Sequence, residues 1–420
     1  MSTSLQPTLG SERIQSLDIL RGIAILGILI MNIQSFAMPS SAYLNPTSFG
    51  DLNGINYWVW VLSHVFADQK FMTIFSILFG AGIVLVTQKA EQREGKSAGL
   101  HYKRTFWLLL IGLFHAHLIW YGDILVAYAL SAFVVFLFRK LNPRKLLFIG
   151  LITISIHTLI YLFIGFNLQY MPAEALIDMR NDFWKPDIDT TYNEVMVLTG
   201  TLSEQIRYNS TSAFEMETTV FAMLMFWRAG GLMLVGMAFY KWGILTAARD
   251  VSFYKKGMIS GFLVGLPIII WGVIKNFEAG WPLEYSMFIG SQFNYWGSLS
   301  FSFAYICTVM NFAKSDKFNA IKERLAAIGQ MALTNYITQS LIGVFIFYGV
   351  GFGFFSQFER IEQVAVMIGI WLIQFGWSKT WLDAYKFGPL EWVWRSLTYV
   401  KLQPMKKEPD QAKDLEKKLA

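Results

Sequence analysis

The sequence predicts an all-α protein, a polytopic membrane bundle of about ten transmembrane helices that forms one integral membrane domain over residues 1–420. Hydrophobic residues make up 54% of the chain, whereas charged residues make up only 15%. Long apolar stretches also recur from end to end, and most can cross a bilayer core of about 30 Å as a helix. This composition excludes a large soluble domain and indicates a membrane protein.

The first apolar stretch, from Ile19 to Phe36, carries charge at its beginning. Asp18 and Arg21 are three residues apart, and Asn32 lies three turns further along the same helical face. Charges inside a membrane are costly and usually functional, so we expect Arg21, paired with Asp18, to contribute with Asn32 to a site for an anionic donor. The alternative is that Arg21 reaches the lipid headgroups and Asp18 only caps the helix. No signal-peptide features precede this stretch, so we expect it to remain as a span.

The other apolar segments follow in order, and each predicts one membrane helix. The second contains Asp68 and Lys70, so we expect it to have an interfacial first part and a span proper from Phe71. Gly80 and Gly82 in that span would let another helix approach closely. The ten predicted segments are 17–36, 57–87, 105–120, 122–138, 146–166, 219–240, 257–276, 288–312, 327–350 and 361–385.

Loop charges orient these spans. Lysine and arginine gather in 88–104, 139–145, 241–256, 314–324 and the tail after Lys401, which places both termini in the cytoplasm. The long loop 167–218 has nine acidic residues against three basic ones and is expected outside, as a helical cap with a short helix after Pro172. Gly388 and Pro389 then predict an interfacial cytoplasmic helix over 388–402, and 406–420 is expected to be a solvated charged tail.

The most reactive residue pattern lies at the junction of the third and fourth spans. His115 lies in the outer part of one predicted helix and Asp123 begins the next after a turn at Gly122, so the carboxylate can orient the imidazole as a general base. We assign catalysis to His115 and Asp123, with Asp68 nearby as a second acid. His117 points to the opposite side of the helix. Packed histidines and a helix-capping Asp123 are the structural alternative.

Polar residues in other spans complete the candidate binding set. Lys70, Arg228 and Asn335 lie in apolar surroundings and should face the bundle interior, where we assign them to substrate or donor binding. The single cysteine, Cys307, argues against a disulfide and a thiolate metal site, and no metal is expected. The basic residues are spread among loops rather than gathered in a patch, so no nucleic-acid partner is expected.

Five short motifs resemble the YeiB-like family of bacterial membrane proteins, and the likeness runs nearly end to end. They are Ser16-Leu-Asp-Ile-Leu-Arg-Gly-Ile23, Lys70-Phe with Phe75-Ser-Ile-Leu-Phe-Gly80, Gly112-Leu-Phe-His115 with Gly122-Asp-Ile-Leu, Met331-Ala-Leu-Thr-Asn335-Tyr, and Phe387-Gly-Pro-Leu-Glu-Trp. The resemblance implies a multi-pass protein of the bacterial inner membrane. It also implies a relation to a wider transmembrane acyltransferase superfamily that includes heparan-α-glucosaminide N-acetyltransferases and sugar O-acyltransferases.

The wider family uses a cytoplasmic acyl-CoA and an acceptor sugar on the other side of the membrane. By that resemblance, Arg21 and Arg104 lie on the correct side to meet the donor phosphates, and His115 lies on the acceptor side. This chain departs from the related O-acyltransferases at Asn32, where they have a histidine. Asparagine cannot serve as a base at neutral pH, so the role would fall to His115.

We therefore expect a membrane acyltransferase that moves an acyl group, with acetyl as the first candidate, from acyl-CoA to an envelope carbohydrate or related small molecule. We expect membrane lipids to surround the protein, and a second copy of the chain, forming a homodimer, is among the partners considered. A proton-coupled transporter or exporter, built on the polar face of the first helix and on His115 with Asp123, is the main alternative. A non-catalytic membrane partner protein is the third.

Overall fold

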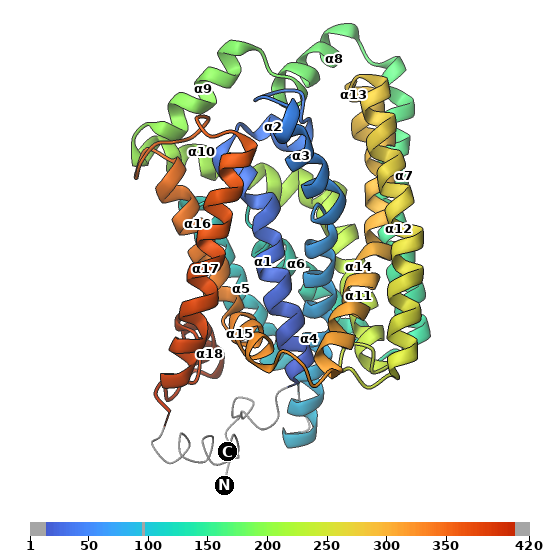
Figure 1. The fold of residues 1–420 in the computed structure, drawn as a ribbon, viewed down its shortest axis with the longest axis vertical. Helices are drawn as coiled ribbons and strands as arrows, with labels where there is room; N and C mark the ends of the chain where they lie inside the picture. Colours follow the sequence, from blue (N-terminus) through green and yellow to red (C-terminus); the bar gives the residue numbers. More distant parts are fainter. Residues whose placement is uncertain (1–13, 95–96, 408–420) are drawn as a thin grey trace.

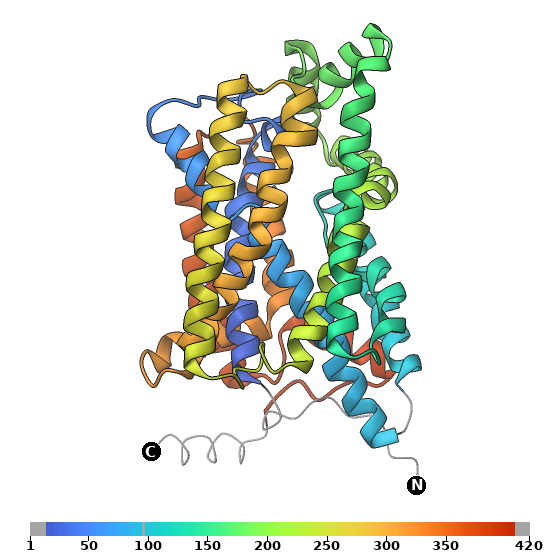
Figure 2. The same ribbon diagram turned by 90° about the vertical axis from the view of Figure 1, so that its right-hand side faces the viewer.

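The computed structural model describes residues 14–94 and 97–407, and it is an all-helical bundle (Figures 1 and 2). Six stretches in the described part are long and apolar enough to cross a membrane, and two shorter apolar stretches, Leu125–Phe138 and Ala332–Phe347, accompany them. α5 (Ala98–Leu118) and α14 (Ser291–Lys314) add two further long helices. Every segment predicted from the sequence as a span is therefore helical, and the predicted fold class is confirmed.

Helix α1 (Gln15–Ala37) lies near the centre of the bundle (Figure 1). It packs against α4 (Lys70–Glu94), α15 (Asn319–Gln330), α16 (Ala332–Phe347) and α17 (Arg360–Ala384). Glycines make the contact with α15 very close: a Cβ on Gly22 would lie 2.0 Å from the Leu325 carbonyl oxygen, and one on Gly329 would lie 2.0 Å from that of Asp18. This contact fixes the charged beginning of α1.

The second predicted span consists of two helices, α3 (Gly54–Phe66) and α4. They are separated at Ala67 to Gln69, and Gln69 has φ of 64°. The sequence predicts an interfacial first part for this segment, and in the structure that part is α3, which lies along the bundle beside α1 (Figure 1). Asn56, Trp60 and Val65 turn one face of α3 inward, against α12, α17 and α1.

Two helix pairs form the other side of the bundle. α7 (Pro143–Asn167) packs along α11 (Phe226–Lys241), and α12 (Val251–Ala279) packs along α14. These helices run roughly parallel to the long axis of the molecule (Figure 2). α6 (Leu125–Val135), continued by the 3-10 turn Phe136–Phe138, lies between α5 and α11.

The long acidic loop is helical, as the sequence predicts. It contains α8 (Ala173–Met179) after Pro172, α9 (Ile188–Thr199) and α10 (Leu202–Glu215), and a π-helix, η5 (Met216–Met225), leads from α10 into α11. α8 and α9 lie at one end of the bundle together with the short α2 (Ser40–Leu44), whereas α18 (Pro389–Tyr399) and the beginning of α1 lie at the opposite end (Figure 1). Of the charged tail predicted over 406–420, residues 408–420 lie outside the described part.

Candidate active site

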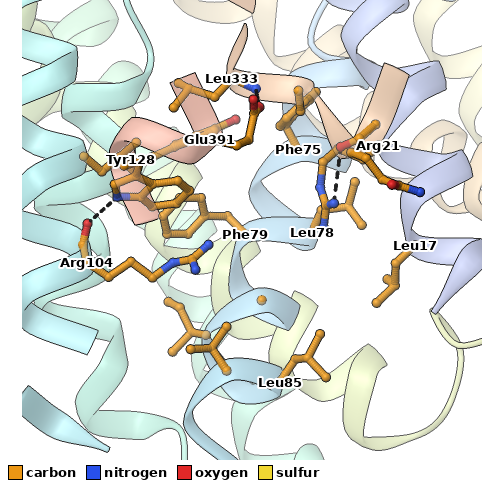
Figure 3. A pocket seen from close by; sticks show the side chains of 18 of the residues that line it. Leu17, Arg21, Phe75, Leu78, Phe79, Leu85, Arg104, Tyr128, Leu333 and Glu391 are labelled. Carbon is orange, nitrogen blue, oxygen red and sulfur yellow. Dashed lines mark hydrogen bonds between the residues drawn. The ribbon is translucent and has the colours of Figure 1, made fainter. Parts of the chain in front are cut away.

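A cavity of ≈ 290 Å³ lies between α1, α4, α5, α6, α16 and α18 (Figure 3). Its walls are mostly apolar, and Phe75, Leu78, Phe79 and Leu108 are among the side chains that line them. Gly82 leaves space in the α4 wall, because a Cβ added there would meet nothing within 4 Å. Most of the cavity wall is therefore apolar.

Charged side chains gather where the cavity meets α18 and the beginning of α1. Four are cationic and two are anionic: Arg21, Lys89, Arg104, Arg395, Asp18 and Glu391. Arg21 Nη1 donates to Asp18 Oδ1 at 2.9 Å and to the Gly329 carbonyl oxygen at 3.4 Å. The Arg21 side chain is 30% exposed, so the pair is accessible to solvent at this end. The i,i+3 ion pair expected from the sequence is present.

Arg104 is the cation best placed to accept an anion. Its guanidinium lies over the Trp394 ring at 4.0 Å, and Trp394 Nε1 donates to the Arg104 backbone carbonyl at 2.8 Å. The guanidinium makes no hydrogen bond to any residue in the described part of the chain. Arg395 and Arg21 are close enough to repel it. Arg21 and Arg104 lie on opposite sides of the cavity (Figure 3), an arrangement that favours an anion between them.

Glu391, on α18, serves as a cap for α16 rather than as a free acid. Its carboxylate accepts hydrogen bonds from the backbone N–H groups of Leu333 and Thr334 and from the Thr334 hydroxyl. These are donors of the first turn of α16, which have no partner inside their own helix. Burial nevertheless raises the pKa of the Glu391 carboxyl, because desolvation outweighs these hydrogen bonds.

His115 and Asp123 lie just beyond the other end of the cavity. His115 Nδ1 and Asp123 Oδ1 are 2.8 Å apart, and the two side chains are 0% and 1% exposed. Asp123 also accepts from the Val126 backbone N–H at 2.7 Å, which fixes its orientation. His115 Nε2 is buried and has no hydrogen-bond partner in the described part of the chain. The arrangement leaves one ring nitrogen of an oriented histidine available for proton transfer.

Tyr336, on α16, connects the cavity to this histidine. Its ring lines the cavity and packs against the His115 ring, with 5.2 Å between centroids. The Tyr336 hydroxyl accepts a hydrogen bond from the Ile124 backbone N–H, next to Asp123. Tyr336, Trp394 and Glu391 are not among the site residues predicted from the sequence. Tyr336 and Glu391 lie within two of the motifs quoted above, and Trp394 lies two residues after the second of these, which is the signal that could have identified them.

Asp68 and Lys70 lie in a different group, apart from His115. Asn294 joins them: Lys70 Nζ donates to its Oδ1 at 2.6 Å, and its Nδ2 donates to Asp68 Oδ2 at 2.7 Å. His64 Nδ1 also lies 3.1 Å from Asp68 Oδ2. The expectation that Asp68 lies near His115 is therefore not met. The break between α3 and α4 brings the Asp68 and Lys70 side chains together at Asn294.

Arg228 belongs to the same buried region. It is 1% exposed, and its guanidinium donates to the Tyr295 carbonyl, the Thr73 hydroxyl and the Ser298 hydroxyl. It faces the interior as predicted, but it does not line the cavity. Lys70 is 0% exposed and likewise does not line the cavity.

The two candidate asparagines differ in their surroundings. Asn335 is fully buried and connects helices: its side chain bonds the Ile328 carbonyl, the Ser378 hydroxyl and the Trp377 indole. Asn32 is half-buried on α1 and does not line the cavity. Of the ten site residues predicted, Asp18, Arg21 and Arg104 line the cavity, and His115 with Asp123 lies beside Tyr336 at its far end.

Comparisons with known proteins place this architecture in a family. A family described as "Protein of unknown function (DUF418)" matches residues 239–401. The chain is 30% identical to the uncharacterized protein YxaH of Bacillus subtilis, over 97% of this chain and 99% of that protein. It is 29% identical to the uncharacterized protein YeiB of Escherichia coli, over 92% of this chain and 96% of that protein. No solved structure matches.

Proposed function

The chain belongs to the DUF418 family of YeiB-like polytopic membrane proteins, and from that premise we propose that it is a membrane-embedded acyltransferase. The donor is an acyl-CoA, with acetyl-CoA as the first candidate, and the acceptor is an envelope carbohydrate or a related small molecule. One observation carries the proposal: a single cavity extends from a cluster of arginines to the tyrosine that packs against His115.

The cavity fits part of such a donor. Its ≈ 290 Å³ is at the lower limit of small-molecule sites, which hold about 300–1,000 Å³. That space suits an acyl group on a slender pantetheine arm and is too small for the nucleotide as well. The phosphates would then stay at the charged end, between Arg21, Arg104 and Arg395. A guanidinium group can donate two parallel hydrogen bonds to the oxygens of one phosphate, which suits these arginines to that role.

His115 supplies the proton chemistry at the far end. With Nδ1–H held by Asp123, its neutral imidazole presents the Nε2 lone pair, which accepts the proton of the acceptor hydroxyl or amine. The acceptor atom bonds to the acyl carbon as the carbon–sulfur bond breaks, and the thiolate leaves with the proton from His115. The Tyr336 ring packs against the His115 imidazole and would help to position the acyl group and the acceptor.

Release of CoA thiol tests the proposal. Purified protein is incubated with acetyl-CoA and a panel of sugars and amino sugars, and free thiol is measured. We expect release that depends on an acceptor. His115→Ala should lower it by about 10²–10⁴-fold and leave CoA binding intact, whereas His157→Gln, at a buried histidine on α7, should retain it. Absence of acceptor-dependent release, with CoA also unbound, would reject the proposal.

The proposal also requires the arginine cluster to face the cytoplasm. Gly99, at the beginning of α5, and Ser203, in α10, are both exposed and therefore suit cysteine labelling. In a Cys307→Ala background, Gly99→Cys should react with an impermeant maleimide only after cells are opened, and Ser203→Cys should react in intact cells. Labelling of both from one side would contradict this orientation.

A proton-coupled transporter is the second candidate, and the buried Lys70 and Arg228 with the half-buried Asp68 favour it. Ionisable groups inside the membrane often mark a path for protons or ions. In proteoliposomes, solute movement driven by a pH gradient, abolished in Asp68→Asn and independent of acyl-CoA, would support transport over acyl transfer.

A further inference from the structure

Three side chains from three elements meet beside the last turn of α5. His117 Nδ1 lies 2.7 Å from the Ser210 hydroxyl oxygen on α10, and His117 Nε2 lies 3.3 Å from Glu217 Oε2 in η5. Each ring nitrogen therefore has one partner, a hydroxyl on one side and a carboxylate on the other. The His117 and Glu217 side chains are 28% and 17% exposed, and Ser210 is half-buried, so the group is accessible from the protein surface.

A hydroxyl, an imidazole and a carboxylate in this order make a serine nucleophilic. If Nε2–H donates to Glu217, the Nδ1 lone pair faces the Ser210 hydroxyl and accepts its proton. We propose that Ser210, His117 and Glu217 form a nucleophilic site for carboxylic esters. Ser210 and His117 are the reacting groups, and Glu217 is a positioning residue that fixes the tautomer.

This site is separate from the His115 site. His115 and His117 are two residues apart on one helix, so their side chains leave it on nearly opposite sides. His115 is fully buried against Tyr336, whereas His117 faces α10 and is partly exposed. The inference does not rest on the proposed acyl transfer, because it uses no thioester and none of the residues around the cavity.

The reaction balances with water as the second reactant. The Ser210 oxygen bonds to the ester carbonyl carbon while its proton passes to His117 Nδ1. The bond from that carbon to the alcohol oxygen then breaks, and the alcohol leaves with the proton. Water attacks the acyl-serine with His117 again as base, releasing the carboxylic acid and restoring the serine. The substrate class is an O-acyl ester that reaches the end of the bundle occupied by α8 and α9.

A fluorophosphonate probe tests the nucleophile directly. We expect full-length protein in detergent to be labelled on Ser210, as located by peptide mass spectrometry, and to hydrolyse p-nitrophenyl acetate. Ser210→Ala should abolish both, and His117→Ala should slow labelling by at least about 100-fold. Ser212→Ala, a half-buried serine on the same helix, is the matched control and should react as wild type. A wild-type protein that stays unlabelled, or a Ser210→Ala protein that is labelled at the wild-type rate, would overturn the proposal.

Glu217→Gln tests positioning apart from folding. Glutamine can keep a hydrogen bond to His117 but loses the negative charge, so the rate of probe inactivation at saturation should fall about tenfold or more while the probe concentration at half-saturation stays unchanged. An unchanged inactivation rate would contradict the role given to Glu217. His115→Ala separates the two sites: labelling of Ser210 should persist in it, whether or not CoA release is found.

Discussion

Two groups of cations, a half-buried one around Arg104 and a buried one around Arg228, are built from the same residue types but have different surroundings in the fold. The Arg228 guanidinium donates to the Tyr295 carbonyl and to the Thr73 and Ser298 hydroxyls, which occupies it within the protein. The Arg104 guanidinium stacks on Trp394 beside a cavity and bonds no residue in the described part of the chain. Burial alone therefore does not identify a binding residue. A binding residue is better identified by hydrogen-bond donors that lie beside a cavity and are not used within the protein.

The difference begins with two glycines on α4. A Cβ on Gly80 would lie 1.9 Å from the Met233 carbonyl oxygen of α11, so Gly80 closes the contact on the Arg228 side. Two residues later, a Cβ on Gly82 would meet nothing within 4 Å, and Gly82 lines the cavity. Residues two apart point to different sides of a helix, so one side of α4 is packed and the other is hollow.

The largest expected effect comes from removing the Arg228 side chain from the packed side of α4. Arg228→Ala would remove three hydrogen bonds made by a charged group and leave two buried hydroxyls and a carbonyl without this donor. Hydrogen bonds to charged groups contribute about 1.5–3 kcal/mol each, so we expect the variant to accumulate poorly or elute as aggregate on size exclusion. Arg104→Ala should remain monodisperse. If the two variants were equally stable, the contrast drawn between the two arginines would be wrong.

Filling the hollow side should act on binding instead of folding. Gly82→Phe adds a ring at a position that lines the cavity and where a Cβ meets nothing within 4 Å, so we expect the affinity for a CoA ligand to fall by more than about tenfold, which corresponds to about 1.4 kcal/mol. Gly369→Phe on α17 is the control, because a Cβ there also meets nothing within 4 Å and Gly369 does not line the cavity. Calorimetric titration measures both. Equal affinities would show that the donor does not enter this space.

Replacing the arginine that contacts the cavity should have a smaller effect. Arg104→Lys keeps the charge but loses the planar group that stacks on Trp394 and binds phosphate with two donors. We expect CoA affinity to weaken by about tenfold, with unchanged thermal stability. Arg21→Lys should behave similarly. If neither variant alters affinity, Arg21 reaches the lipid headgroups only, and the anion site is absent.

The smallest effect concerns Glu391 and pH. Burial raises the pKa of this carboxyl in the folded protein, so the folded state holds the proton more tightly than the unfolded state. Stability is therefore highest below the ordinary glutamate pKa of about 4.3 and falls as pH rises through the raised pKa. Thermal unfolding of Glu391→Gln should lack this fall. A wild-type protein that gains stability relative to Glu391→Gln over the same pH range would contradict the assignment.

Periodicity and loop composition predict this fold well, because every apolar segment must form a helix to satisfy its backbone in a membrane. Local pairs such as Asp18 with Arg21 also follow from helical spacing alone. Asp68 shows the limit: its partner Asn294 is 226 residues away, and it meets Lys70 there because Gln69 breaks the helix with a positive φ. Tyr336 and Ser210 are ordinary residues in sequence and become notable only through the helices that pack beside them.

The cap that Glu391 provides joins two parts of the molecule mechanically. Its carboxylate holds the N–H groups of Leu333 and Thr334, and Tyr336 lies only two residues beyond Thr334 on the same helix. Arg395, one turn from Glu391 on α18, lines the charged end of the cavity. One carboxylate therefore connects the helix that carries Arg395 to the helix whose tyrosine packs against His115. The charged end of the cavity and its far end thus share a direct structural connection outside the cavity itself.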